Sequence, residues 1–288
     1  MSAKSYHLYH LVDPSPWPIV TAVGLFGLTT GSVMCFHFYN DGLIILLLGL
    51  LTVLLSAFVW WRDIIRESTF EGFHTEPVQN GIRIGVVLFI VSEVMFFSSF
   101  FWAFFHSSLA PTIELGGVWP PIGLSVFNPF EVPFLNTVVL VLSGATITWA
   151  HFGLLENLIK NVMVSLNITI YLALFFTLLQ LCEYTEATFS MSDGVYGSVF
   201  YMATGFHGFH VIVGTIFILV TAYRIKNFHL SRKHHLGFLA ASWYWHFVDV
   251  VWLFLFIAIY WWGNFDGLIL IENPSKLFNS SNFISNFK

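Results

Sequence analysis

Charge is scarce in this sequence. Asp, Glu, Lys and Arg make up only 9% of its 288 residues, whereas 57% are hydrophobic, and soluble domains carry roughly 25% charged residues. With 11 Lys and Arg and a formal net charge of −5, the chain lacks a basic face to neutralise phosphates, which argues against nucleic-acid binding. The composition therefore predicts a protein that crosses a membrane several times.

Cysteine is equally rare. Cys35 and Cys182 both lie in apolar segments, and neither has a second cysteine nearby. This spacing excludes a disulfide framework and a metal site of the Cys-x-x-Cys type. The N-terminal stretch MSAKSYHLYHLVDPSPWP lacks the apolar core of a signal peptide and the Arg-rich pattern of a transit peptide. We therefore expect membrane insertion to use the internal spans.

Long apolar runs dominate the rest of the chain, and we expect an all-α membrane protein of seven transmembrane helices. The turn YNDG joins the first two runs into a hairpin. The expected organisation is an N-terminal inner-side segment at 1–16, a two-helix hairpin at 17–61, an inner-side loop at 62–83, a five-helix bundle at 84–263 and a polar outer tail at 264–288. The predicted spans are 17–39, 42–61, 84–105, 132–152, 162–184, 195–223 and 237–263.

Basic residues set the expected orientation. Under the seven-span scheme the loops at 40–41, 106–131 and 185–194 contain no Lys or Arg, and the positive-inside rule assigns the basic side to the interior. The N-terminus is then inside and the C-terminus outside, with only Lys276 and Lys288 breaking the pattern. The basic residues on the N-terminal side are Lys4, Arg62, Arg66, Arg83, Lys160, Arg224, Lys226, Arg232 and Lys233.

One carboxylate interrupts the third apolar run. Glu93 is the only ionisable side chain between Ile84 and Phe105, and at about 1.5 Å per residue this segment is about 33 Å long. Glu93 therefore lies near the membrane midplane, where a charge is costly. We expect its carboxyl group to be protonated and hydrogen-bonded at neutral pH. A proton-handling role and a structural role both remain open.

Two further polar pairs lie near the middle of predicted spans. The motif GFHGFH contains His207 and His210, and the motif WYWHFVD contains His246 and Asp249. Each pair has i,i+3 spacing, so its members share one helix face, which we expect to point into the bundle. Three interpretations stay open: a metal or haem site, proton handling, and a hydrogen-bond network between helices, which we favour.

Charged and aromatic residues also gather at the inner interface, in the motif WWRDIIRESTFEGFH. Arg66 and His74 are suited to binding a phosphate group, and Glu67 to binding an ethanolamine headgroup. Arg224 and His229 are suited to binding a second phosphate group on the same side of the membrane. From the residues alone, ordinary anchoring by positive charge and aromatic belts is the simpler interpretation.

Over about residues 6–263 the chain closely resembles subunit 3 of the haem-copper cytochrome c oxidases in its mitochondrial form. The resemblance implies that the first two helices open away from the other five in a V, with phospholipids bound in the cleft. It implies no catalytic residue and no metal in this chain, because haem a and copper lie in partner subunits 1 and 2. It also implies a subunit that stabilises the catalytic core and supports proton uptake. The motifs that carry it are DPSPWP, WWRDIIRESTFEGFHT, LFIVSEVMFF, FWAFFHSSLAPTIELGGVWPP, FEVPFLNT, ITWAH, SDGVYGSVFYMATGFHGFHVIVGT and WYWHFVDVVWLFLFIAIYWWG.

The same motif match implies roles for single residues and partners. Glu93 resembles the buried glutamate of the family's third helix. Subunit 1 is the expected main contact, with subunit 2 and accessory subunits beside it, in the mitochondrial inner membrane with the N-terminus on the matrix side. Leu239 stands where the family commonly has Glu, and Phe152 where a second His is usual. The positions that resemble lipid contacts are Trp61, Arg66, Glu67, His74, Arg224 and His229.

Other classes of protein fit the sequence less well. A seven-span retinal protein needs a Lys in its last helix, and residues 237–263 contain none. A proton-coupled transporter that uses Glu93 and the midplane His and Asp residues is the alternative, although the sequence shows no internal repeat. A haem-binding electron carrier needs facing axial ligands, for which His210 and His246 are candidates. We expect no haem spectrum from the isolated chain.

Overall fold

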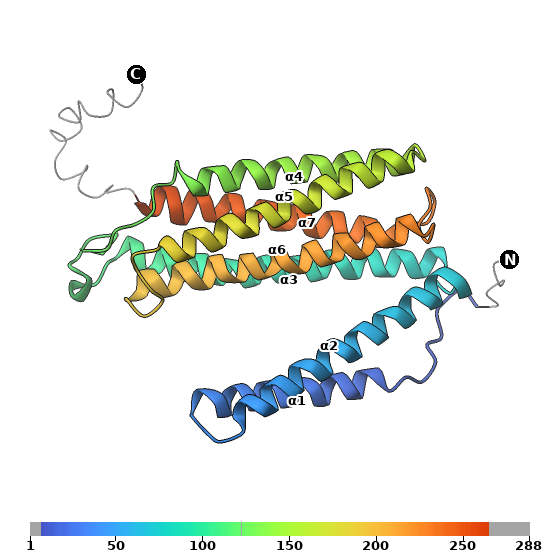
Figure 1. Cartoon of the computed structure of the whole chain (residues 1–288), viewed down its shortest axis with the longest axis horizontal. Helices are drawn as coiled ribbons and strands as arrows, with labels where there is room; N and C mark the ends of the chain where they lie inside the picture. Colours follow the sequence, from blue (N-terminus) through green and yellow to red (C-terminus); the bar gives the residue numbers. More distant parts are fainter. Residues whose placement is uncertain (1–6, 122, 265–288) are drawn as a thin grey trace. The chain divides into compact units, whose positions relative to one another are not determined.

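The computed structural model describes residues 7–121 and 123–264, and every regular element in these ranges is helical. Seven of these helices have the length and apolar composition needed to span a membrane, which confirms the predicted fold class (Figure 1). Apart from Asn264, the predicted outer tail lies outside the described residues. The long helices are α1 Trp17–Phe36, α2 Gly42–Arg66, α3 Glu76–Leu109, α4 Val132–Leu155, α5 Ile159–Glu186, α6 Val195–Lys226 and α7 Leu236–Leu255.

The segment 62–83, expected to be a loop, is mostly helical. α2 ends at Arg66 and is followed directly by a π-helical turn, η1 Glu67–Glu71. α3 then begins at Glu76. Gly72 ends the π turn in the left-handed conformation, with φ 72°, which glycine adopts without steric cost. The prediction ended each span at the first charged residue. Because Arg and Glu are good helix formers, the helices extend beyond the apolar runs.

The described residues from His7 to Ile84 belong to one compact unit, in which α1 and α2 make an antiparallel hairpin. A Cβ atom at Gly31 would lie 2.3 Å from the backbone nitrogen of Leu46, and one at Gly49 would lie 2.3 Å from that of Leu28. The two backbones therefore approach so closely that only glycine fits, as is typical of membrane helices that pack through small residues.

Replacing Gly31 with valine is expected to disrupt this hairpin. Its first added carbon would meet the Leu46 backbone nitrogen at 2.3 Å and Cα at 2.6 Å, and backbone cannot move aside as a side chain can. We expect a loss of about 1–3 kcal/mol or more of stability, measured as a lower midpoint of thermal denaturation of the purified protein. Gly27→Ala is the matched control, because its Cβ would meet Gly49 Cα at 3.5 Å, an ordinary contact. Equal midpoints for the two variants would contradict the close packing.

The described residues from Gly85 to Asn264 belong to the second unit, whose helices are drawn side by side in Figure 1. α4 packs against α5 and α7, and α6 packs against the same two helices. Large side chains that are less than 2% exposed, such as Trp245, Trp252 and Phe176, fill the centre. α3 joins this group through aromatic side chains, with the Phe96 and Phe206 rings 5.0 Å apart and perpendicular. The polar residues of α3, α6 and α7 are thereby held at fixed depths in an aromatic core.

Candidate functional site

Glu93 of α3 is paired with a histidine of α6. Its Oε2 atom lies 2.9 Å from His210 Nε2, and the Glu93 side chain is 21% exposed whereas that of His210 is 9% exposed. The rings of Phe97 and Tyr244 lie 5.1 and 6.3 Å from the His210 ring. The Glu93 carboxyl group is therefore hydrogen-bonded within the bundle, as expected, and its partner is one of the two histidines of the GFHGFH motif.

The second nitrogen of His210 determines how many protons this pair holds. His210 Nδ1 lies 2.6 Å from the carbonyl oxygen of Phe206, and a carbonyl only accepts, so Nδ1 carries a hydrogen. His210 Nε2 then either accepts a hydrogen from a neutral Glu93 carboxyl group or, in the imidazolium, donates one to the carboxylate. In both cases a single proton is shared between Glu93 and His210, and the pair has no net charge. Protonation of Glu93 itself stays a prediction.

His207 has a structural environment. The side chain is 1% exposed, and its Nε2–H donates to the carbonyl oxygen of Val248 in α7 at 3.1 Å. Its ring lies beside those of Phe176 and Trp252, at 5.6 and 5.1 Å. His207 therefore joins α6 to α7 in the aromatic core, which fits the hydrogen-bond network favoured from the sequence.

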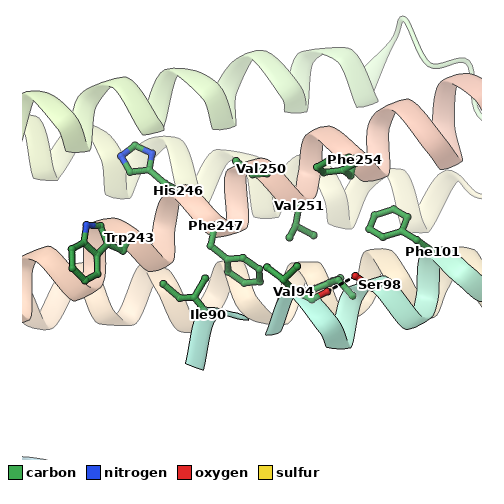
Figure 2. Close-up of a pocket in the computed structure, with 11 residues that line it drawn as sticks. Ile90, Val94, Ser98, Phe101, Trp243, His246, Phe247, Val250, Val251 and Phe254 are labelled. Carbon is green, nitrogen blue, oxygen red and sulfur yellow. Dashed lines mark hydrogen bonds between the residues drawn. The ribbon is translucent and has the colours of Figure 1, made fainter. Parts of the chain in front are cut away.

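His246 and Asp249 point to another helix. His246 Nε2 lies 3.3 Å from Thr148 Oγ1 of α4, and Asp249 Oδ2 lies 3.0 Å from the position that a Cβ atom of Gly144, also in α4, would occupy. Figure 2 shows His246 on the α4 side of α7, whereas Phe247 points towards α3. The two polar pairs thus contact different neighbours and do not converge on one centre.

The metal and haem interpretations gain no support from this arrangement. Among residues 7–121 and 123–264, no three His, Cys, Asp or Glu side chains gather closely enough to hold a metal ion. His210 bonds to α3 and His246 contacts α4, so these two rings serve separate helix contacts rather than facing one another across a haem.

At the end of α2 in the first unit, the residues expected to contact lipid lie beside a carboxylate that the sequence did not single out. Asp63 Oδ2 accepts from Trp17 Nε1 at 2.7 Å, and its Oδ1 lies 4.0 Å from Arg66 Nη1. Glu67 Oε2 lies 3.6 Å from His10 Nε2. Trp61 is 64% exposed. This end of α2 therefore carries one exposed aromatic side chain, that of Trp61, and one partly exposed guanidinium group, that of Arg66.

Aromatic rings pack together in the segments next to this end of α2. The His10 ring stacks on Phe73 at 5.1 Å and meets the His74 ring edge-on at 5.8 Å. Thr75 Oγ1 donates to the carbonyl oxygen of Leu8, which ties the segment before α1 to the start of α3. His74 is therefore held between two ordered segments of the first unit.

In the second unit, Arg224 and His229 lie at the end of α6. Arg224 packs over Gly237 at the start of α7, since a Cβ atom on Gly237 would lie 2.8 Å from Arg224 Nη1. The backbone N–H of His229 donates to the carbonyl oxygen of Arg224 at 2.9 Å. Of the two departures from the family pattern, Phe152 is 60% exposed on α4 and Leu239 is partly buried in α7.

A second buried carboxyl group, Glu183, escaped the sequence reasoning. It is 2% exposed, and its Oε1 accepts from Tyr260 Oη at 2.6 Å and from Gln180 Nε2 at 3.3 Å. Tyr260 lies in a π-helical segment, η3 Phe256–Trp261, that continues α7. In the sequence, Glu183 lies at the end of an apolar run and so resembles a residue at the boundary of a span. Its i,i+3 spacing from Gln180 could have indicated a polar pair on one helix face, as the same spacing did for His207 and His210.

Removing this acceptor is expected to destabilise the second unit. Glu183→Ala leaves the Tyr260 hydroxyl and the Gln180 amide unpaired in the interior, which should lower stability by about 1–3 kcal/mol. Glu183→Gln keeps the volume and an acceptor oxygen, so its thermal midpoint should stay close to that of the wild type. Equal thermal midpoints for Glu183→Ala and Glu183→Gln would show that the hydrogen bonds of Glu183 contribute nothing to stability.

Seven membrane-spanning helices with polar pairs between them define the class, a multi-pass helical membrane protein. Within that class, the sequence model of cytochrome c oxidase subunit III matches residues 7–264. Cytochrome c oxidase subunit 3 of Prototheca wickerhamii is 60% identical over 258 residues, which cover 90% of this chain and 98% of that protein. The Marchantia polymorpha protein of the same name is 58% identical over 264 residues, covering 92% and 100%, and that of Equus asinus is 60% identical over 258 residues, covering 90% and 98%.

The chain belongs to the cytochrome c oxidase subunit III family. It is a non-catalytic core subunit of the terminal oxidase of the respiratory chain, it carries no redox centre of its own, and other oxidase subunits are its partners. The resemblance noted in the sequence is thereby confirmed, and the transporter alternative is set aside.

Proposed function

We propose that this chain stabilises the catalytic core of the oxidase, supports proton uptake and binds phospholipid at the inner interface. Subunit 1 is its main contact, with subunit 2 and accessory subunits beside it, and these partners hold haem a and copper. The observation that carries the proposal is the pair of Glu93 and His210, 2.9 Å apart within the membrane span. Such a pair holds one exchangeable proton at a depth where ionisable groups are otherwise excluded.

The lipid part of this proposal depends on the inner end of α2. Arg66 keeps 59% of its side chain exposed, and Trp61, five residues earlier in α2, keeps 64% of its surface exposed. A guanidinium group donates in a fork that matches phosphate oxygens, and indole rings favour the headgroup region. Glu67 and His74 of the same unit, and Arg224 and His229 of the other, are the further proposed headgroup contacts.

The proposed location is the mitochondrial inner membrane, with the N-terminus on the matrix side and the C-terminus on the intermembrane-space side. The support for this orientation is the absence of Lys and Arg from 40–41, 106–131 and 185–194. An N-terminal epitope should be cleaved by added protease only after the inner membrane is opened. Cleavage in intact mitoplasts would reverse the orientation.

One preparation tests the proposed function. The complex that contains this chain is isolated in mild detergent, and its reduced-minus-oxidised spectrum, subunit masses and lipid masses are recorded together. We expect haem a signals, subunits 1 and 2, and retained phospholipid. A complex with haem a but no lipid would remove the lipid role alone, and a chain that migrates without a haem-bearing partner would overturn the whole proposal.

A further inference from the structure

Three buried polar side chains of the second unit carry atoms that no other side chain or backbone group satisfies. Asn136 of α4 is 0% exposed, and Gln180 and Glu183 of α5 are 6% and 2% exposed. Among the described residues, neither amide atom of Asn136 has a hydrogen-bond partner, and the same holds for Gln180 Oε1 and Glu183 Oε2. Because buried polar atoms are almost always hydrogen-bonded, four such atoms point to a small polar ligand.

Two contacts fix the register of α4 against α5, which pack together in the second unit. A Cβ atom on Gly153 would lie 3.1 Å from the Val162 side chain, and Thr146 Oγ1 lies 2.8 Å from Thr169 Oγ1. Seven residues towards the start of α4 therefore correspond to seven residues towards the end of α5. The two helices run antiparallel with equal steps.

The same steps bring Asn136 and Gln180 to one level of the bundle. Asn136 lies ten residues before Thr146 in α4, and Gln180 lies eleven residues after Thr169 in α5. The two levels agree to within one residue, or about 1.5 Å. Eleven residues are about three turns, so Gln180 leaves α5 in the same direction as Thr169, towards α4. Glu183 belongs to the same cluster, because its Oε1 accepts from Gln180 Nε2 at 3.3 Å.

The unsatisfied atoms require a ligand that both donates and accepts. Asn136 Nδ2 only donates, whereas Asn136 Oδ1 and Gln180 Oε1 only accept. Water does both, and a buried water molecule typically makes about three hydrogen bonds to such groups. A cation such as Mg²⁺ or Ca²⁺ takes about six or more oxygen ligands, which is more than these three side chains supply, and it would leave Asn136 Nδ2 unpaired. The donor set therefore favours water.

We propose that Asn136, Gln180 and Glu183 form an internal water-binding site between α4 and α5. The water accepts from Asn136 Nδ2, donates to Gln180 Oε1 and is hydrogen-bonded to Glu183 Oε2. Since Glu183 Oε1 also accepts from Tyr260 Oη at 2.6 Å, the site extends one hydrogen-bond network over α4, α5 and the π-helical continuation of α7. The inference is independent of the proposed function, because all these residues belong to this chain.

A cryo-electron microscopy map of the wild-type assembled oxidase, at a resolution that shows ordered water, identifies the ligand. We expect at least one isolated peak about 2.5–3.2 Å from Gln180 Oε1, Glu183 Oε2 and an amide atom of Asn136. Direct hydrogen bonds from Asn136 to the other two side chains, with no peak between them, would overturn the inference. A peak surrounded by about six oxygens at about 2.6 Å or less would identify a cation instead and would equally overturn it.

A double-mutant cycle in the purified oxidase provides an independent measurement. Asn136→Ala and Gln180→Ala should each lower the thermal midpoint of the subunit. Together they should lower it by clearly less than the two separate losses added, because either substitution alone already removes a ligand of the water. Asn136→Ala combined with Asn167→Ala is the matched control, since Asn167 is exposed on α5, and these two effects should add. Additive losses for Asn136 and Gln180 as well would show that the two side chains share no ligand and would refute the site.

Discussion

Glu93→Leu is expected to destabilise the subunit by about 1–3 kcal/mol, because it leaves a buried nitrogen of His210 without its hydrogen-bond partner. Glu93→Gln keeps the side-chain volume, and its amide N–H can donate to His210 Nε2, so its stability should remain near that of the wild type. Thermal release of the subunit from the purified oxidase measures both. A midpoint for Glu93→Leu equal to that of the wild type would mean that the 2.9 Å contact contributes no stability.

Turnover separates the structural role of Glu93 from a proton-handling role. The initial rate of oxygen reduction should be nearly unchanged in both variants, because the redox centres lie in other chains. Since neither Gln nor Leu carries an exchangeable acid proton, sustained turnover should fall in both if Glu93 takes part in proton uptake. Normal sustained turnover of Glu93→Gln would restrict Glu93 to a structural role.

Infrared spectroscopy reads the protonation of Glu93 directly. We expect a protonated carboxyl band in the wild type that is insensitive to pH near 7 and is lost in Glu93→Gln. The band must be assigned from the difference between these two proteins, because Glu183 is a second buried carboxyl group. Loss of ionised carboxylate absorption instead would show that the pair exists as imidazolium and carboxylate.

Arg66→Gln is expected to release phospholipid from the oxidase. A hydrogen bond to a charged group contributes about 1.5–3 kcal/mol, so the affinity of the proposed headgroup site should fall roughly tenfold or more. Bound phospholipid per haem a, measured by mass spectrometry after a fixed detergent wash, gives the result. Addition of salt should narrow the difference, because screening weakens an exposed charge contact.

Arg62→Gln is the matched control for Arg66→Gln. Both arginines lie in the last turns of α2, but Arg62 Nη2 is 2.8 Å from Asp63 Oδ1, whereas Arg66 Nη1 is 4.0 Å from it. The guanidinium group of Arg62 is therefore already occupied, and its loss should leave lipid content nearly unchanged. Equal lipid loss in the two variants would indicate general charge anchoring rather than a headgroup site at Arg66.

Sequence reasoning located the midplane carboxyl group but not its environment. The position of Glu93 in a long apolar run was enough to predict its depth, whereas its partner, His210, lies 117 residues away and could not be predicted. The i,i+3 rule correctly assigned His246 and Asp249 to one helix face, yet it carries no information on which neighbouring helix that face meets. Glu183 was missed because its run ends at an apparent boundary, and only the fold brings Tyr260 to it.

The sequence by itself determined the number of spans, the helical class and the family. These are local properties, since the length of an apolar run is compared with the bilayer thickness one helix at a time. Only the tertiary structure decided that Glu93 bonds to His210, that His207 bonds to α7 and that Asp249 lies close to Gly144, where its Oδ1 has no hydrogen-bond partner among the described residues. Such pairings depend on the rotation and relative height of each helix, which are set by the packing of side chains that are far apart in the chain.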